Sequence, residues 1–238
     1  MEQIAHMETN LSGKFGVPRQ SGVISALQGR IVFEPKYRNP DALRGLETFS
    51  HIWLIWQFSE AVRPGETPPV TVRPPRLGGN TRMGVFATRS PFRPNNLGLT
   101  VVKIESISLD GPEGPVITVS GVDLMDGTPI FDIKPYLPYA DAVPDASGGY
   151  TDTLPDLQLQ VVFPDTLLQQ IPEVCRQELL GILKHDPRPQ YQRKPGRVYG
   201  LTYLNYNVRF SIDDTEHTLT VQELTVQECN KPSPRKAK

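Results

Sequence analysis

Residues 99–107 read Leu99-Thr-Val-Val-Lys-Ile-Glu-Ser-Ile107, and β-branched residues recur throughout this run. One side of the run carries Val101, Lys103, Glu105 and Ile107, and the other carries Val102, Ile104 and Ser106. A period of two is typical of a β-strand with one mixed face. We therefore expect a strand over residues 99–107.

Four further runs of β-branched or aromatic residues surround this strand, each bounded by Gly, Pro or Asn. They cover residues 30–34, 52–59, 84–88 and 116–122. Residues 40–46 are expected to form a short helical turn. Residues 23–122 are therefore predicted to form a compact, mostly antiparallel β-domain, for which a barrel is one way to close the sheet.

The pattern loosens after Asp126. Residues 129–150 are rich in Pro and Gly and predict a long ordered loop, whereas residues 163–170 and 173–185 have helical patterns. The second helix is expected to end near Asp186, because Pro187 disfavours the helical conformation of the residue before it. Residues 197–210 and 217–225 predict a β-hairpin.

We thus predict a mainly β protein, with a barrel domain over residues 1–150 and a small α+β domain over residues 151–238. Hydrophobic residues make up 38% of the 238 residues and charged residues 21%, which is enough apolar material for a core. The longest apolar run, residues 52–56, is too short to span a membrane. The N-terminus lacks the pattern of a signal peptide.

Two cysteines cannot form a disulfide framework, so a cytoplasmic protein is expected. The four histidines share no metal-ligand spacing with the cysteines, so no metal site is expected.

Charge is segregated along the chain. Residues 63–103 hold seven basic residues and one acid, residues 110–156 hold nine acids and one lysine, and residues 184–209 hold six basic residues and one acid. These segments are either three solvated faces or two basic surfaces on either side of an acidic pocket. The second arrangement suits a polyanion that presents one base to a cationic cofactor.

Several common motifs are absent. The sequence has no G-x-G-x-x-G, no Walker lysine motif and no G-x-S-x-G. It also lacks the (Asp/Asn)-Pro-Pro-aromatic loop of most N6-adenine methyltransferases.

An arginine-rich segment, residues 72–95, is unusual instead. Its arginines adjoin prolines and glycines, so their guanidinium groups hang from a stiff backbone that suits an anion-binding or stacking site. The alternative is that these arginines pair with the acidic segment.

Two shorter motifs are candidates for chemistry. Asp123 and Asp126 flank a strand end before a Gly-Thr-Pro turn, where a carboxylate either accepts from ribose hydroxyls, acts as a base, or simply caps its own loop. Asp186-Pro-Arg-Pro-Gln-Tyr191 follows a helix end. Its prolines are expected to hold Arg188 and Tyr191 outward for a phosphate and a stacked base, or else to form a rigid connector.

These motifs resemble those of one known family. The matching blocks are residues 17–20, 44–47, 49–51, 71–80, 82–95, 123–129, 132–136 and 186–191. Together they resemble the YaeB-type tRNA methyltransferase family, TrmO. The resemblance implies transfer of a methyl group from S-adenosylmethionine to N6 of N6-threonylcarbamoyladenosine at position 37 of threonine tRNA. It also implies a single-sheet β-barrel, a small C-terminal domain and a homodimer.

The resemblance also implies site residues. The cofactor pocket would include Pro18, Arg19, Gln20, Phe58, Ser59, Arg89, Leu99, Asp123, Leu124, Met125 and Asp126. Asp126 or Asp123 is the candidate base, with Tyr191 as a further catalytic candidate. Arg82, Arg93, Arg188 and Lys194 are the candidate contacts to tRNA phosphates or the carbamoyl group. Residues 5–10 depart from the family pattern at the position of its first strand.

Two other functions remain open from the residues alone. One is a non-catalytic β-barrel that binds a nucleotide or RNA and recruits a partner. The other is a small-molecule methyltransferase, which would share the cofactor and ignore tRNA. Binding of S-adenosylmethionine separates the first from an enzyme, and dependence on tRNA separates the second.

Overall fold

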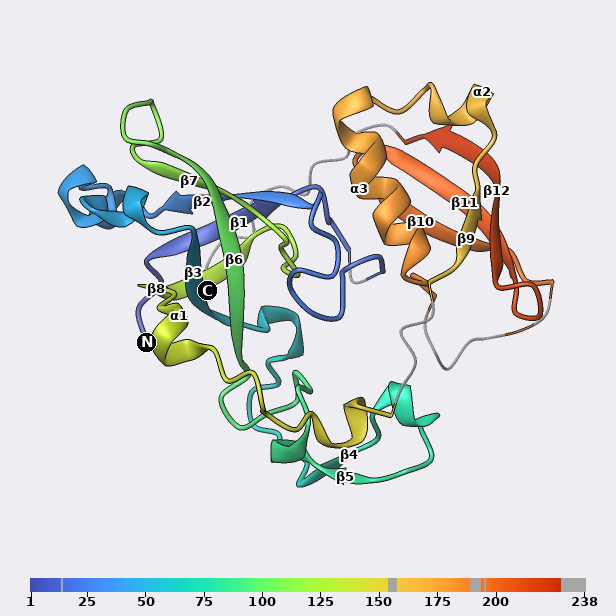
Figure 1. Ribbon diagram of the computed structural model, residues 1–238, viewed down its shortest axis with the longest axis horizontal. Helices are drawn as coiled ribbons and strands as arrows, with labels where there is room; N and C mark the ends of the chain where they lie inside the picture. The colour runs from blue at the N-terminus through green and yellow to red at the C-terminus, as the bar shows by residue number, and fades with distance from the viewer. Residues whose placement is uncertain (14, 154–157, 189–193, 195, 228–238) are drawn as a thin grey trace.

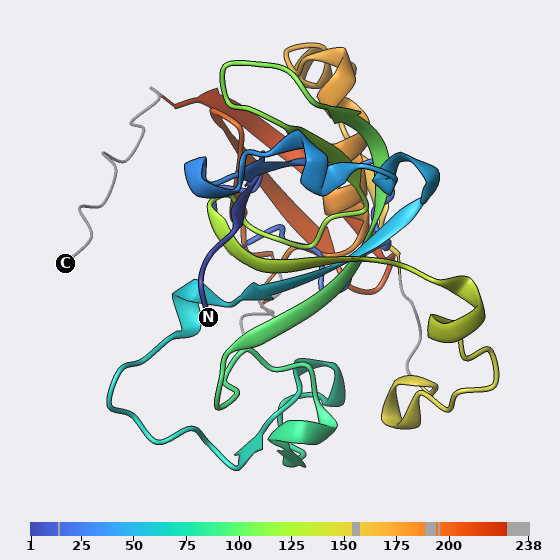
Figure 2. The same ribbon diagram turned by 90° about the vertical axis from the view of Figure 1, so that its left-hand side faces the viewer.

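The computed structural model describes residues 1–13, 15–153, 158–188, 194 and 196–227 of the chain. Six strands form a closed antiparallel barrel in the order β1-β2-β7-β6-β3-β8 (Figures 1 and 2). They are β1 (Ala5–Thr9), β2 (Gln28–Phe33), β3 (His51–Gln57), β6 (Leu97–Ser108), β7 (Val116–Ser120) and β8 (Thr128–Pro135). The predicted single-sheet barrel is therefore confirmed, as is the expected strand over residues 99–107, which is the larger part of β6.

Alternation explains why these segments form barrel strands. In β3 the side chains of Ile52, Leu54 and Trp56 are buried, whereas the residues between them are partly exposed. Successive side chains of a strand point to opposite faces, so the apolar set fills the barrel interior.

The structure corrects two predictions in the first half of the chain. Residues 84–88 are not one strand: β5 (Met83–Gly84) pairs with β4 (Thr71–Val72), and a 3₁₀ turn, η6 (Val85–Ala87), follows at once. The reason is local, because the backbone N–H of Thr88 donates to the carbonyl of Val85 and turns the chain.

The predicted loop over residues 129–150 is the second correction, because its start is the barrel strand β8. Pro129 and Pro135 stand at or near the two ends of this strand, where a missing backbone donor costs little. The same segment continues into the short helix α1 (Pro138–Asp141) and the 3₁₀ turn η7 (Gly149–Thr151). The first strand, β1, is present even though residues 5–10 depart from the family pattern.

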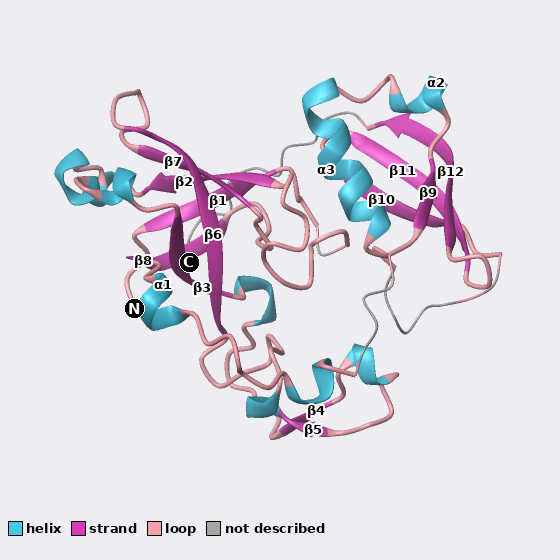
Figure 3. Ribbon diagram, in the orientation of Figure 1, coloured by secondary structure: helices cyan, strands magenta, loops and turns pink. Residues whose placement is uncertain are grey.

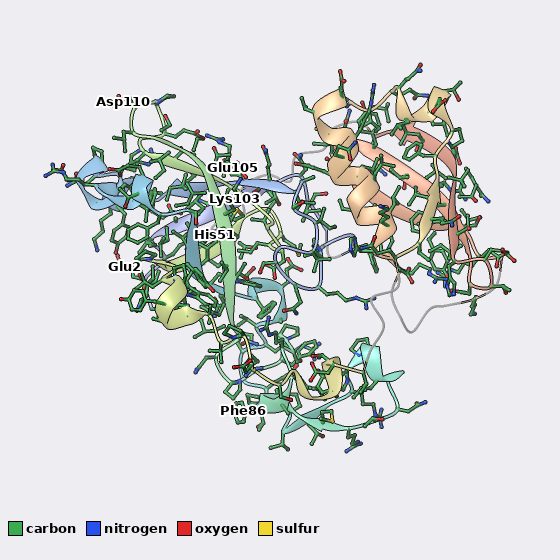
Figure 4. The ribbon with its side chains drawn as sticks, in the orientation of Figure 1. Glu2, His51, Phe86, Lys103, Glu105 and Asp110 are labelled. Atoms are coloured by element: carbon green, nitrogen blue, oxygen red, sulfur yellow. The ribbon has the colours of Figure 1, made fainter. Side chains whose placement is uncertain are left out.

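Two connections of the barrel are long. The one between β2 and β3 contains η1 (Pro35–Tyr37), η2 (Pro40–Leu43) and η3 (Leu46–Thr48), which confirms a helical turn there. The other, residues 58–96, contains η4 (Ser59–Ala61), η5 (Pro75–Leu77) and the β4-β5 pair, and projects from the barrel as an arm. Phe86 lies on this arm, away from the C-terminal part of the chain (Figure 4).

The C-terminal part is a four-stranded sheet covered by one long helix (Figure 3). Its elements are β9 (Gln160–Val162), α2 (Asp165–Leu168), α3 (Glu173–Lys184), β10 (Tyr199–Tyr203), β11 (Tyr206–Asp213) and β12 (Thr218–Val226), in the sheet order β10-β11-β12-β9. The α+β prediction is confirmed, and α3 ends just before Asp186 as expected. The predicted hairpin is a three-stranded meander, because the chain reverses at Leu204 with a φ of 53°.

Buried apolar residues of the barrel and of the C-terminal part form one continuous cluster, from Ala5 in β1 to Leu224 in β12. The predicted boundary near residue 150 falls between β8 and β9. Within the described residues, no helix is long and apolar enough to cross a membrane.

Candidate active site

One end of the barrel gathers three connections that carry most of the predicted site residues. Strands β1, β3 and β7 end there, and β2, β6 and β8 begin there. Residues 10–27, 58–96 and 121–127 therefore emerge side by side, although they are far apart in the sequence. This convergence follows from barrel closure, because antiparallel neighbours place alternate strand ends at the same rim.

Asp123 lies at the centre of this rim, in the connection between β7 and β8. Its Oδ1 accepts a hydrogen bond of 2.9 Å from the hydroxyl of Thr100, and it also accepts from the backbone N–H of Ser21 and from its own N–H. The hydroxyl of Thr100 in turn accepts from the indole N–H of Trp56 at 3.0 Å. A chain of hydrogen bonds thus runs from the barrel interior to one carboxylate.

Burial raises the pKa of Asp123 from 3.8 to about 6. The hydrogen bond from Thr100, the backbone donors and the positive charge of Arg89 all act in the opposite direction and only partly offset the desolvation. A carboxylate with a pKa near neutrality is a better proton acceptor than an ordinary aspartate and is still largely ionised at pH 7. Asp123 therefore has the properties of a general base.

The predicted turn at Pro18, Arg19 and Gln20 lies against this carboxylate. The guanidinium of Arg89 donates to the side-chain oxygen of Gln20, and the amide of Gln20 donates to the carbonyl of Arg19. Since Arg89 also interacts with Asp123, the structure brings the turn, the arginine and the carboxylate together. Pro18 is buried and Arg19 is exposed.

Aromatic packing closes the other side of the rim. The rings of Trp56 and Phe58 have centroids 4.3 Å apart, and the backbone N–H of Phe58 donates to Asn96 at the neck of the arm. Gly98 allows the indole to approach β6, because a Cβ there would stand 2.3 Å from an indole carbon of Trp56. Ser59 is exposed at the start of η4.

Three other predicted residues follow Asp123, and each has a structural contact. The Oδ1 atom of Asp126 accepts from the backbone N–H of Thr9 at 3.0 Å, which ties the end of β1 to the rim. Leu124 is 1% exposed and belongs to the core, so only its backbone is available to a ligand. Met125 is half-buried, and its carbonyl accepts from the hydroxyl of Thr128.

Leu99 is not brought to the carboxylate. It is next to Thr100 in β6, but its side chain is 59% exposed and lies on the outer face of the barrel, whereas Thr100 points inward. A cofactor at Asp123 would therefore not contact the Leu99 side chain from inside the barrel, and the predicted cofactor contact would require a ligand bound at the outer face.

The four candidate tRNA contacts differ strongly in exposure. Arg82 and Lys194 are exposed. Arg93 is half-buried and donates to the carbonyls of Val85 and Thr88, so it braces the η6 turn.

The structure corrects the prediction that Arg188 points outward to a phosphate. Its side chain is 1% exposed and donates to Asp186 at 2.8 and 2.9 Å and to Asp214 at 2.7 and 3.1 Å. Burial lowers the pKa of Arg188, but these hydrogen bonds outweigh it and raise the pKa overall. The predicted outward orientation is wrong, because two carboxylates neutralise the guanidinium inside the fold. Tyr191, the other candidate of this motif, lies outside the described residues.

The inner partners of the candidate site, Trp56, Thr100 and Ser21, are not among the residues that the sequence predicted. A usable signal exists for Thr100, because the alternation of β6 places it on the same face as the buried Val102. A polar residue on a buried face needs a hydrogen-bonding partner, and Asp123 supplies it. No local pattern identifies Ser21, whose contribution is a backbone N–H.

No group of three or more His, Cys, Asp or Glu residues that could hold a metal ion occurs within the described part of the chain.

Comparisons with known proteins cover both parts of the chain. A family model described as the tRNA-methyltransferase O N-terminal domain matches residues 6–142, and the TrmO C-terminal domain matches residues 156–227. A relative from Escherichia coli strain K12, named tRNA (adenine(37)-N6)-methyltransferase, is 38% identical over 221 residues, which cover 90% of this chain and 93% of the relative.

Two further similarities concern the cofactor and the fold. A Pyrococcus abyssi relative, named a probable S-adenosyl-L-methionine-binding protein, is 34% identical over 136 residues, covering 57% of this chain and 67% of the relative. The crystal structure of TrmO from Pseudomonas aeruginosa is similar with a TM-score of 0.74 and 32% identity, covering 94% of this chain and 95% of that one.

The buried position of Arg188 predicts a loss of stability when it is removed. Arg188→Ala should lower the free energy of unfolding by about 3 kcal/mol, because it removes the cation shared by two carboxylates. Urea denaturation measures this change. Arg82→Ala and Lys194→Ala are the matched controls and should change stability by less than about 0.5 kcal/mol. An Arg188→Ala variant as stable as the unmodified chain would contradict the structural role.

The raised pKa of Asp123 predicts a pH-dependent stability. The folded state holds the proton up to about pH 6 and the unfolded state only up to about 3.8, so stability falls as pH rises through this window. Asp123→Asn has no carboxylate to desolvate. It should therefore be more stable than the unmodified chain by up to about 3 kcal/mol at pH 8, and by less than about 1 kcal/mol at pH 4.

Urea denaturation at the two pH values measures this difference. Asp126→Asn is the matched control, since that carboxylate is exposed. The same advantage of Asp123→Asn at both pH values would show that desolvation of the carboxylate is not its cause.

Proposed function

The chain belongs to the TrmO family of tRNA methyltransferases, and from that premise we propose how its own residues carry out the reaction. It is a tRNA (adenine-N6)-methyltransferase acting at position 37, and S-adenosylmethionine is the cofactor of the family. We further propose that the methyl acceptor is N6-threonylcarbamoyladenosine in threonine tRNA. The observation that carries the mechanism is the partly buried carboxylate of Asp123, which accepts from Thr100 beside the turn at Pro18–Gln20 and Arg89.

The groups at the rim fit S-adenosylmethionine in their chemistry. This cofactor combines a sulfonium cation, an amino-acid group and an adenosine, and it supplies the methyl group. Asp123 offers a carboxylate to its cationic or hydroxyl groups, Arg89 and Arg19 offer cations to its carboxylate, and Phe58 offers an aromatic face to its adenine. The Pro18–Gln20 turn and the loop from Asp123 to Asp126 are the proposed walls of the pocket.

We propose that Asp123, rather than Asp126, is the general base. The threonylcarbamoyl group makes N6 part of a urea, which is a poor nucleophile until its proton leaves. Asp123 is partly buried and has its pKa raised to about 6, so at neutral pH it is an available base in a partly desolvated site. The carboxylate of Asp126 is exposed and accepts from the backbone of Thr9. The main task of the other residues is to hold the two reactants in line.

The tRNA would approach the rim across the two exposed basic positions. Arg82 on the arm and Lys194 beyond α3 are the proposed phosphate contacts, whereas Arg93 shapes the arm. Tyr191 remains a proposed contact to the base on the strength of the family motif alone.

We also propose a homodimer that acts in the cytoplasm. The dimer rests on the family resemblance and on the exposed apolar side chains Leu99, Phe86 and Val70, which a second subunit would shield. The location follows from the substrate, since tRNA is a cytoplasmic molecule.

Methyl transfer tests the function and the substrate together. Tritium from labelled S-adenosylmethionine should enter only tRNA that carries the threonylcarbamoyl group, and digestion should release methylated N6-threonylcarbamoyladenosine. Asp123→Asn should lower kcat at least about 100-fold, the size expected for a general base, while Asp126→Asn retains most of the activity.

Other outcomes would support rival functions. Tight cofactor binding without incorporation into any tRNA would support a small-molecule methyltransferase. Absence of cofactor binding would support a non-catalytic, RNA-binding adaptor. Continued turnover by the Asp123→Asn, Asp126→Asn double variant with bound cofactor would exclude both carboxylates as the base.

Salt dependence tests the proposed phosphate contacts. Arg82→Ala and Lys194→Ala should each reduce the slope of log affinity for tRNA against log salt concentration by about 0.7 to 0.9, because one fewer counterion is released. Filter binding over a range of salt concentrations measures the slope. Lys36→Ala, which removes an exposed lysine paired with Glu2, is the control and should leave the slope unchanged. An unaltered slope in either test variant would remove that residue from the interface.

A further inference from the structure

The connection between β1 and β2, residues 10–27, carries the proposed cofactor turn but is not held by the barrel alone. On the barrel side, Gly22 donates to the carbonyl of Gly121, and Ser21 donates to Asp123. These contacts fix the turn at Pro18–Gln20 relative to the carboxylate. The rest of the connection faces α3 and β10, as Figure 1 shows for the blue segment between the two parts of the molecule.

Glu178 of α3 binds both ends of this connection. Its Oε2 accepts from the side-chain amide of Asn10 at 3.0 Å, and its Oε1 accepts from the backbone N–H of Gln28 at 3.1 Å. The residue is 6% exposed. A buried carboxylate is costly unless donors surround it, so this one favours the arrangement in which both ends are present.

Tyr203 of β10 completes the set of donors. Its hydroxyl donates to Oε2 of Glu178 at 2.7 Å. Burial, followed by the hydrogen bond to Glu178, raises the pKa of Tyr203, so the phenol stays protonated and donates. The carboxylate thus links the helix and the sheet of the C-terminal part to the first two strands of the barrel.

The middle of the connection packs against the same helix and against β10. A Cβ at Gly181 would stand 2.6 Å from Cγ2 of Ile24, and a Cβ at Gly16 would stand 2.7 Å from Cδ1 of Leu201. These two glycines permit contact closer than any side chain would allow. Within the connection, these contacts fall at Gly16 and Ile24, which lie on either side of the cofactor turn in the sequence.

We propose that Glu178 and the face of α3 around Gly181 are positioning elements of the cofactor site. They touch neither of the proposed cofactor groups, Asp123 and Arg89, and act by holding residues 10–27 so that the Pro18–Gln20 turn and Ser21 meet Asp123. The affinity of the barrel for S-adenosylmethionine therefore depends on the C-terminal part of the chain. This inference rests on the proposed assignment of the turn to the cofactor pocket.

Two variants test the inference by different routes. Gly181→Ala introduces a methyl group against Ile24 while improving the helix propensity of α3, so the helix itself is not weakened. Glu178→Gln keeps the size of the side chain but puts an amide N–H₂ where two donors or a backbone N–H now point. Each should weaken the binding of S-adenosylmethionine, measured by titration calorimetry on the full chain, by about tenfold, within the usual range for coupled sites.

Matched controls lie on the same helix. Glu173→Gln repeats the acid-to-amide change at an exposed position, and Gln177→Ala places an alanine at an exposed position of α3. Both should bind the cofactor as the unmodified chain does. Hydrogen exchange provides a second readout: the amides of residues 15–28 should exchange faster in the two test variants, while those of β3 and β6 should not.

The outcomes separate this inference from the function itself. Unchanged cofactor affinity in Gly181→Ala and Glu178→Gln, beside normal binding by the unmodified chain, would overturn the positioning role and leave the function intact. An affinity loss accompanied by faster exchange throughout the barrel would also overturn it, since general destabilisation would then be the cause. Failure of the unmodified chain to bind the cofactor would overturn the proposed function instead.

Discussion

Closure of the barrel by the pairing of β8 with β1 and β3 is the constraint on which the rest of the structure depends. Ala5, His6 and Met7 pair with Ile130, Pro129 and Thr128, and the opposite edge of β8 pairs with β3. Without these ladders the sheet would have two open edges and no common rim. With them, three connections from distant parts of the sequence meet at one end, and the loop that carries Asp123 is fixed among them.

Two carboxylates, one partly and one fully buried, then connect this rim to its surroundings. Asp123 is desolvated, with a pKa raised to about 6, and is joined to the barrel interior through Thr100 and Trp56. Glu178 accepts hydrogen bonds from Asn10, Gln28 and Tyr203 and so joins the barrel to the C-terminal part. The first is suited to accept a proton, because desolvation makes its charged form costly. The second is suited to hold the C-terminal part against the barrel, because both of its oxygens accept hydrogen bonds from these donors.

A third group of charges, Arg188 with Asp186 and Asp214, differs from what its motif predicts. Arg188 lies between prolines in a basic segment, which predicts an exposed phosphate contact. Inside the fold it is neutralised by Asp186, two residues away, and by Asp214 from the turn between β11 and β12. Its position between α3 and that turn gives it a structural role, whereas Arg82 and Lys194, the remaining proposed tRNA contacts, are exposed.

The sequence by itself determined the β-class of the first half, the helix α3 and its end, and the family, because alternation, proline positions and long motifs are local properties of the chain. Through the family resemblance it also proposed Asp123, Gln20 and Arg89 as candidate site residues, which the structure places close together. It did not reveal β8, whose prolines resemble those of a loop until the strand is paired. Only the tertiary structure distinguished Asp123 from Asp126, placed Leu99 outside and Arg188 inside, and brought Glu178 to Asn10. Burial and these hydrogen bonds depend on partners from other elements, from 23 positions away for Thr100 and Asp123 to 168 for Asn10 and Glu178, and no local pattern encodes them.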